Sequence, residues 1–291
     1  MVHTIKNGAM CATIDTLGAQ LQSLTAADGT EYLWYGDPAY WGSRATNLFP
    51  YVGRLTDGSY IHKGERYEMT QHGFAKRMEF SVTHAEESKI IFTLTDNEET
   101  LACFPFRFAF SVIYELDDST LHITYRVENN GDDTMHFGLG GHPGFRLPLE
   151  SGKCFEDYRV TFAQPCHPAR ALLSPAYQMS GVEAPYPLEN DTTIPLHHDL
   201  FDDDAIILHH FDKTVTLSAG EGTRGVRLHL PKMNYLGIWH AVKTDAPFVC
   251  LEPWVSLPSR DSIVEDFSQQ GDLVALEAGG IYDNKWSITL L

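Results

Sequence analysis

The stretch Leu121-His-Ile-Thr-Tyr-Arg-Val-Glu128 alternates apolar and polar side chains at every position. Successive side chains of an extended chain point to opposite faces, so this pattern predicts a strand with one buried face and one polar face. Short runs with similar patterning occur on both sides of it along the chain. They span Lys89–Leu94, Phe108–Leu116, Tyr158–Phe162, Thr214–Leu217 and Gly225–Leu230.

Turn-forming residues separate these runs. Asp117-Asp118-Ser119 precedes the first stretch and Asn130-Gly131-Asp132 follows it, and the pairs Asp28-Gly29, Asp57-Gly58 and Lys63-Gly64 mark other turns. Consecutive runs joined by tight turns pair in an antiparallel way. The sequence shows no long stripe of apolar residues at helical spacing, and we expect one short helix, near Ser262–Gln269. The chain is therefore predicted to be all-β, a large antiparallel β-sandwich.

The segment from Ala163 to Asp204 lacks this alternation. It carries prolines at positions 165, 168, 175, 185 and 187, followed by Pro195. We therefore expect a long irregular excursion over one face of the sheet. Long loops inside compact domains commonly serve function, so this one is a candidate functional segment. A linker between two halves is the alternative. Strand patterns resume on both sides without a change in composition, so a single domain covering 1–291 is predicted.

Charge and cysteine usage restrict the partners. The chain has 21 Lys and Arg against 39 Asp and Glu, a net charge of −18, which repels a phosphate backbone and argues against a nucleic-acid partner. Its five cysteines form no C-x-x-C pair, and their sparse, odd number suits a reducing compartment. We find no signal-peptide pattern and no apolar run long enough to span a bilayer. These features predict a cytoplasmic protein with no membrane partner.

Four short motifs carry more functional residue types than a generic β protein needs. They are Asn47-Leu-Phe-Pro-Tyr-Val-Gly-Arg54, Gln71-His-Gly-Phe-Ala-Lys-Arg77, Gly140-Gly-His-Pro-Gly-Phe145 and Cys250-Leu-Glu-Pro-Trp254. Two of them place a histidine beside glycine, where the chain turns sharply and offers the ring to a cleft. Glu252 ends the apolar run that starts at Pro247, and burial there raises the pKa of a carboxyl toward the range of a useful base.

Each motif also has a plainer interpretation. A glycine-flanked histidine such as His72 or His142 is often a turn residue bonded to backbone, and Glu252 can be a carboxylate paired with a lysine. Arg54 can be a cation in a surface turn, and Trp254 can be core or the wall of a cleft. The pairs His197-His198 and His209-His210 have no partner at a metal-ligand spacing, so we predict no metal site.

Taken together and in order, these motifs resemble the aldose 1-epimerase (galactose mutarotase) family, in its short bacterial, LacX-like branch. The resemblance covers nearly the whole chain. It includes Leu17-Gly-Ala-Gln-Leu-Gln-Ser-Leu24, Tyr32-Leu-Trp-Tyr-Gly-Asp-Pro38, Leu48-Phe-Pro-Tyr-Val-Gly-Arg54, His72-Gly-Phe74, Gly141-His-Pro-Gly-Phe145 and Leu251-Glu-Pro-Trp254. It implies a galactose mutarotase-like supersandwich with a cleft along one sheet, and interconversion of the α and β anomers of a free aldose.

The resemblance also implies roles for individual residues. Glu252 matches the general base that takes the proton of the anomeric hydroxyl, and His142 matches the general acid that protonates the ring oxygen. His72 matches a second histidine that polarises the sugar, and Arg54 an arginine that binds its hydroxyls. An acidic sugar ligand is expected among Asp202, Asp203 and Asp204, with Asp204 preferred because it directly precedes an apolar strand. Trp254 is placed with the sugar-binding residues.

Aromatic side chains offer surfaces on which a pyranose ring can stack. The candidates are Trp34, Tyr35, Tyr40, Trp41 and Trp239. The chemistry needs no cofactor, which fits the absence of G-x-G-x-x-G, P-loop and G-x-S-x-G patterns. The expected partner is a small-molecule sugar, and the oligomeric state stays open, with a homodimer as one alternative.

The sequence departs from the longer galactose mutarotases at His142. There the equivalent histidine follows Asn, whereas here it lies in Gly141-His142-Pro143, so the natural sugar can differ from galactose. A related branch acts on hexose 6-phosphates and holds the phosphate with extra arginines. Here Lys76, Arg77 and Arg146 adjoin the key histidines. A hexose-6-phosphate 1-epimerase is therefore one alternative function, and a non-catalytic carbohydrate-binding or sensor protein is another. A cupin-like metal enzyme is a more distant one.

Overall fold

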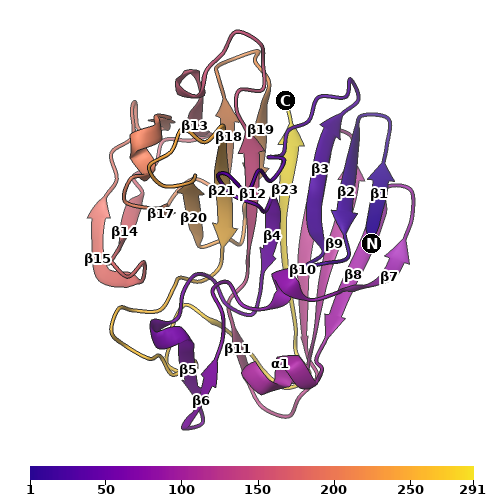
Figure 1. Ribbon diagram of the computed structural model, residues 1–291, viewed down its shortest axis with the longest axis vertical. Helices are drawn as coiled ribbons and strands as arrows, with labels where there is room; N and C mark the ends of the chain where they lie inside the picture. Colours follow the sequence, from indigo (N-terminus) through magenta and orange to yellow (C-terminus); the bar gives the residue numbers. More distant parts are fainter.

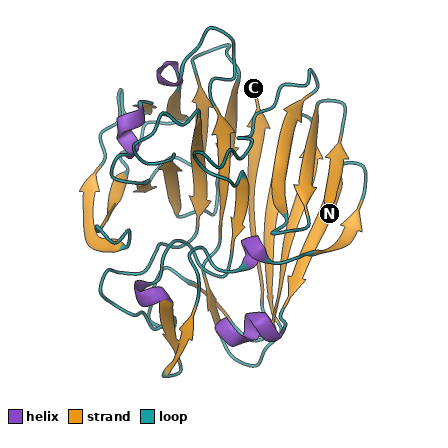
Figure 2. Cartoon of the chain, in the orientation of Figure 1, coloured by secondary structure: helices purple, strands orange, loops and turns teal.

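The computed structural model describes all residues from Met1 to Leu291, and its regular structure consists mostly of antiparallel strands (Figures 1 and 2). The larger of its two main sheets has nine strands. Their order is β16 (Thr193–Pro195), β13 (Arg159–Phe162), β18 (Thr214–Ser218), β19 (Gly225–His229), β23 (Ile281–Leu290), β10 (Thr120–Asn129), β9 (Phe108–Asp117), β8 (Lys89–Thr95) and β7 (Ser81–Ala85).

The second main sheet has seven strands and carries the motifs singled out above. Their order is β15 (Met179–Pro185), β14 (Ala169–Leu173), β17 (Ile206–His209), β20 (Tyr235–Trp239), β21 (Phe248–Trp254), β12 (Gly140–Arg146) and β4 (Ala45–Leu48). In Figure 1, β15 and β14 form one edge of the molecule, and β7 lies at the opposite edge.

Three smaller sheets complete the structure. A three-stranded sheet contains β1 (Val2–Lys6), β2 (Met10–Asp15) and β3 (Gln20–Ala26). Two two-stranded sheets complete the set: β5 (Ser59–His62) forms a hairpin with β6 (Glu65–Glu68), and β11 (Met135–Phe137) pairs with the distant β22 (Val274–Leu276). The helices are short: α1 (Glu98–Cys103) and the 3-10 turns η1 (Thr56–Gly58), η2 (Ala75–Arg77), η3 (Phe155–Asp157) and η4 (His198–Phe201). None of these helices has the length and apolar character that crossing a membrane requires.

The hydrophobic core lies between the two main sheets. In β10, Leu121, Ile123, Tyr125 and Val127 are buried, and the residues between them are partly exposed. These four belong to one cluster of 65 buried residues, to which β9, β12, β20, β21 and β23 also contribute. The apolar residues of the alternating stretch Leu121–Glu128 therefore lie on the inner face of the nine-stranded sheet. The predicted antiparallel β-sandwich is confirmed.

Strands β4 and β21 are instead buried along their whole length. Their inner face packs on the core, so a second layer of side chains must cover their outer face. In β21, Val249 and Leu251 join the core, whereas Cys250, Glu252 and Trp254 point to the outer side. The period of two thus sends the polar members of the Cys250–Trp254 motif away from the core.

Two expectations about the fold were wrong. Ser262–Gln269 forms turns and no helix, and the only α-helix begins after Asn97. The Asn97 side chain accepts a hydrogen bond from the amide of Thr100, whose hydroxyl accepts one from the Asn97 amide. This pair of reciprocal hydrogen bonds caps and stabilises a helix that is too short to show a periodic pattern of apolar residues.

The segment from Ala163 to Asp204 is the second correction, because it is not a continuous irregular loop. It contributes β14 and β15 to the edge of the seven-stranded sheet and β16 to the edge of the nine-stranded sheet. Edge strands tolerate proline, as at Pro185 and Pro195. Most of β15 is exposed, so it has no buried face to impose an alternating sequence.

Candidate active site

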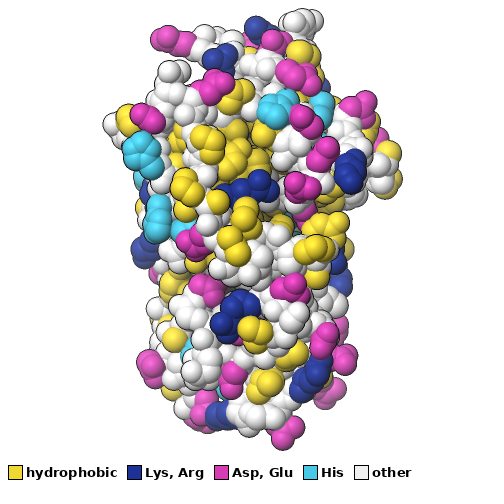
Figure 3. Space-filling view, turned by 90° about the vertical axis from the view of Figure 1, so that its left-hand side faces the viewer, with side chains coloured by type: hydrophobic (Ala, Val, Ile, Leu, Met, Phe, Trp, Pro, Cys, Tyr) yellow, Lys and Arg dark blue, Asp and Glu magenta, His cyan; other side chains and the backbone are white.

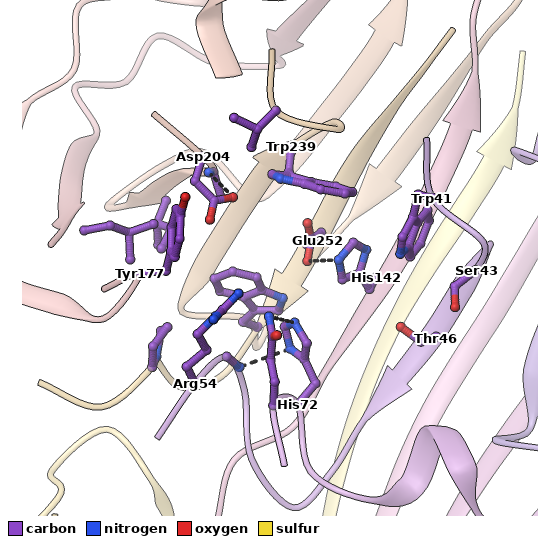
Figure 4. A pocket seen from close by; sticks show the side chains of 18 of the residues that line it. Trp41, Ser43, Thr46, Arg54, His72, His142, Tyr177, Asp204, Trp239 and Glu252 are labelled. Atoms are coloured by element: carbon purple, nitrogen blue, oxygen red, sulfur yellow. Dashed lines mark hydrogen bonds and ion pairs between the residues drawn. The ribbon is translucent and has the colours of Figure 1, made fainter. Parts of the chain in front are cut away.

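A cavity of about 440 Å³ opens on the outer face of the seven-stranded sheet, and all four motifs reach it. Figure 3 shows the face at the β14–β15 edge, where hydrophobic side chains surround a group of Lys or Arg side chains. The side chains in Figure 4 come from β4, β12, β20 and β21 and from the loops around them. Predicted site residues that line this cavity are Arg54, His72, His142, Asp204, Glu252 and Trp254.

His142 and Glu252 form the floor of the cavity on two neighbouring strands. The pairs Gly140–Trp254 and Gly144–Cys250 set the register between β12 and β21, which places His142 opposite Glu252. Nε2 of His142 lies 3.2 Å from Oε2 of Glu252, as Figure 4 shows. The two residues are 9% and 2% exposed, so both are removed from bulk water.

Burial shifts both groups toward their neutral forms. Desolvation, with the nearby Asp204 carboxylate, raises the pKa of Glu252 well above its ordinary value, which confirms the direction expected from its apolar surroundings. Desolvation lowers the pKa of His142 to about 3. A raised carboxyl pKa beside a lowered imidazole pKa favours a proton on the Glu252 carboxyl and a neutral His142 ring. The 3.2 Å between Nε2 and Oε2 is short enough for that proton to pass from one group to the other, although the two atoms make no aligned hydrogen bond.

His72 is held by hydrogen bonds to the segment that carries Arg54. The His72 amide donates to the carbonyl of Gly53 at 2.8 Å, and the Gly53 amide donates to Nδ1 of His72 at 3.1 Å. Because Nδ1 accepts, the proton of the neutral ring lies on Nε2. Desolvation and the neighbouring His142 lower the pKa of His72 well below its ordinary value, so the ring stays neutral. Its Nε2 already lies 3.2 Å from the side-chain amide of Gln71.

The backbone around His72 depends on glycine at position 73. His72 and Gly73 have φ angles of 64° and 71°, in the left-handed region. A Cβ atom on Gly73 would lie 2.2 Å from the carbonyl oxygen of Phe49, which accepts hydrogen bonds from the amides of Phe74 and Ala75. Only glycine lets the backbone at position 73 pass this close to the Phe49 carbonyl, which explains why a glycine follows His72 in the motif.

Arg54 and Asp204 lie on the wall of the same cavity. The Arg54 guanidinium lies over the Tyr177 ring, 5.1 Å from its centroid. Asp204 Oδ1 accepts a hydrogen bond from the Ala205 amide at 2.9 Å, and burial raises the pKa of its carboxyl. Asp202 and Asp203 are exposed and do not line the cavity.

Of the five aromatic candidates, the structure brings Trp41 and Trp239 to the cavity. Trp41 stacks on the His142 ring with a centroid distance of 4.6 Å, and Trp239 meets the same ring edge-on at 5.6 Å. Trp34 is fully buried and its indole donates to the Trp41 carbonyl, so it supports the site from behind. Tyr35 and Tyr40 do not line the cavity.

The three cations beside the key histidines are placed differently. Lys76 lines the cavity and makes no hydrogen bond or ion pair, and desolvation lowers the pKa of its amine. Arg77 points elsewhere and donates to the Thr70 hydroxyl. Arg146 is exposed and does not line the cavity.

The histidine pairs also lie outside the cavity. His198 contacts His240, with 3.1 Å between Nδ1 and Nε2, and His209 lies 3.3 Å from Glu183. Sequence reasoning missed Tyr177, on the β14–β15 turn, although the long segment that holds it was expected to serve function. It also missed Thr46 and Gln71, polar residues whose types are too common to stand out.

Comparison with known proteins agrees with this architecture. The family model for aldose 1-epimerase matches residues 1–266. LacX of Lactococcus lactis subsp. lactis, in its plasmid form, is 29% identical over 303 aligned positions that cover all of both chains. The chain therefore belongs to the aldose 1-epimerase family.

Two solved structures share a comparable level of sequence identity with this chain. A galactose mutarotase related enzyme from Lactobacillus acidophilus superimposes with a TM-score of 0.95 at 34% identity, covering 100% of this chain and 97% of the other. A galactose mutarotase-like protein from Lactobacillus casei gives a TM-score of 0.93 at 32% identity, covering all of both chains. This chain thus has the galactose mutarotase-like β-sandwich fold that its motifs implied.

Proposed function

We propose that this protein is a mutarotase that interconverts the α and β anomers of a free aldose by acid–base ring opening and closure. Glu252 accepts the proton of the anomeric hydroxyl and His142 donates a proton to the ring oxygen as the C1–O5 bond breaks. Rotation about C1–C2 turns the other face of the aldehyde toward the ring hydroxyl. Ring closure then runs with the proton transfers reversed, which restores both groups to their starting state.

The remaining cavity residues fit the binding of a sugar. Nε2 of His72 and the Gln71 amide that contacts it offer hydrogen bonds to a sugar oxygen, and Arg54 and Asp204 offer a donor and an acceptor to hydroxyls. The faces of Trp41 and Trp239 exclude water around the reacting pair. Transfer of the shared proton from the Glu252 carboxyl to the His142 imidazole produces the base and the acid together, with no change in total charge.

One observation carries the proposal: three polar atoms of the cavity are buried without a hydrogen-bond partner. They are Nδ1 of His142, Oε2 of Glu252 and the indole Nε1 of Trp254. Buried polar atoms in folded proteins are nearly always paired, so three such atoms around one cavity indicate a ligand rich in hydroxyl groups. A binding protein needs only donors and acceptors, whereas the adjoining proton-sharing pair favours turnover.

A second candidate, a mutarotase for phosphorylated sugars, rests on Lys76. A partly buried amine with no carboxylate partner is unusual inside a cavity, because its desolvation is not compensated. A phosphate group on the sugar would provide that partner. The net charge of −18 opposes a phosphosugar at long range, but the local charges of Lys76 and Arg54 determine the field inside the cavity.

The test is polarimetry of freshly dissolved α-galactose and α-glucose, and of glucose 6-phosphate in parallel. Glu252→Gln and His142→Asn should each slow relaxation by roughly 10²–10⁴-fold, with the fold intact by circular dichroism. Lys76→Met is the matched control: it should spare the free sugars and impair only a phosphorylated substrate. Sugar binding without faster relaxation of any of the three would reject the enzyme and support the binding protein.

A further inference from the structure

A third side chain, a thiol, adjoins the His142–Glu252 pair. Cys250 precedes Glu252 by two residues on β21, so both side chains point to the outer face of the sheet. A ring nitrogen of His142, Sγ of Cys250 and a carboxylate oxygen of Glu252 all lie within 4.8 Å of one another. Cys250 has no part in the acid–base chemistry proposed above.

Nitrogen, sulfur and oxygen from these three residue types are the donors that Zn²⁺ prefers in proteins. The bond lengths of such a site are about 2.0–2.3 Å, so ligand atoms now within 4.8 Å need only small side-chain rotations to converge on one ion. Three protein ligands leave the fourth tetrahedral position open toward the cavity. Oε2 of Glu252 is buried without a hydrogen-bond partner, so it is not already committed to another group.

The charges at this place suit a dication. A carboxylate from Glu252 and a thiolate from Cys250 would balance the two charges of the ion, and the neighbouring Asp204 carboxylate adds to the attraction. Lys76, near His142, opposes it. The ion reaches the site through the cavity, because His142 and Glu252 both line it (Figure 4). Cys250 lies behind them, fully buried.

We propose that His142, Cys250 and Glu252 form a binding site for Zn²⁺ or Cd²⁺ that excludes the sugar from the cavity. Binding releases to solvent both the proton of the Cys250 thiol and the proton held by the His142–Glu252 pair, and it forms metal–sulfur, metal–nitrogen and metal–oxygen bonds with no change in oxidation state. The metal and the sugar compete because each requires His142 and Glu252. Only this competition rests on the proposed function; the metal site itself does not.

Titration calorimetry of the metal-free protein with ZnCl₂ tests the site without turnover. We expect one ion per chain, and a loss of affinity of at least about 100-fold in Cys250→Ser and Cys250→Ala, because even residues that only orient a ligand cost 10–100-fold. Cys11→Ser is the matched control, a cysteine outside the cluster that should leave the affinity unchanged. Binding that is absent, or equally strong in the Cys250 variants, overturns the proposal.

Cobalt substitution covers the case in which the Cys250 variants fail to fold. Wild type loaded with Co²⁺ should show the near-ultraviolet charge-transfer absorption of a cobalt–thiolate bond, and its absence would refute the role of Cys250. Cys250→Ser should retain mutarotation in chelator and lose its sensitivity to zinc. If no sugar is turned over at all, calorimetry and absorption still decide the metal site, so the two proposals fail separately.

Discussion

One buried histidine outside the cavity should contribute to a loss of stability of this protein in acid. His240 follows β20 and is fully buried among the rings of Phe155, Phe201 and Phe248. Its Nδ1 lies 2.7 Å from the Ala241 carbonyl, to which it donates. Its Nε2 therefore accepts from His198, and the neutral ring is satisfied on both sides.

Burial, together with the nearby His198, lowers the pKa of His240 from 6.5 to about 4, against the opposing effects of the hydrogen bond to Ala241 and of Asp202. A folded-state pKa below the unfolded one means that the unfolded chain binds the proton more readily, so stability is lost as the pH falls from about 6.5 to about 4. The linkage relation gives a loss of about 2 kcal/mol at pH 5 and about 3 kcal/mol at pH 4, relative to pH 7. That is a large part of a typical domain's stability.

Urea unfolding of wild type and His240→Gln at pH 7 and pH 5 measures the effect. Glutamine cannot titrate, so the variant should lose about 2 kcal/mol less than wild type over this interval, even if it is less stable at pH 7. His167→Gln replaces a mostly exposed histidine and serves as the control. Equal losses in wild type and His240→Gln would show that the buried ring does not govern acid stability.

Three further predictions concern the support of the cavity. Gly73→Ala should lower the free energy of unfolding in urea by more than about 3 kcal/mol, because it adds a backbone clash to left-handed strain. The control Gly64→Ala, with φ of 82° and open space around it, should cost only about 1–2 kcal/mol. Equal costs would refute the clash between a side chain at position 73 and the Phe49 carbonyl. Asn47→Leu should cost roughly 3 kcal/mol, since the Asn47 amide donates to three buried oxygens and accepts from a tyrosine hydroxyl; a neutral result in thermal unfolding would contradict this. Trp41→Ala should raise the KM for sugar with a smaller change in unfolding free energy, whereas an unchanged KM would remove Trp41 from the binding surface.

The sequence predicted the sandwich wherever a strand has one buried face. The alternation of Leu121, Ile123, Tyr125 and Val127 reflects the contact of β10 with the core, and local contrast of this kind is readable without any partner strand. It failed where that contrast is absent: β15 is exposed along most of its length, and α1 is stabilised by a cap rather than by periodicity. The prolines between positions 163 and 204 therefore indicated a loop where edge strands form.

Residue types and their order also determined the candidate site. Glu252 at the end of an apolar run was predicted to be desolvated because its sequence neighbours are apolar, and its raised pKa follows from that burial. His72 beside Gly73 marked a place where the backbone must turn sharply. These inferences needed only the chemistry of neighbouring residues along the chain.

Only the tertiary structure decided which distant residues meet. The pairing of β12 with β21 places His142 3.2 Å from Glu252 and brings Cys250 beside them, although 107 positions separate His142 from Cys250 in the numbering. It also selected Asp204 over its two neighbours and left Lys76 unpaired in the cavity. Sheet register and strand order arise from the packing of the whole chain, and a period of two along one strand specifies a face but not the side chain that lies across from it.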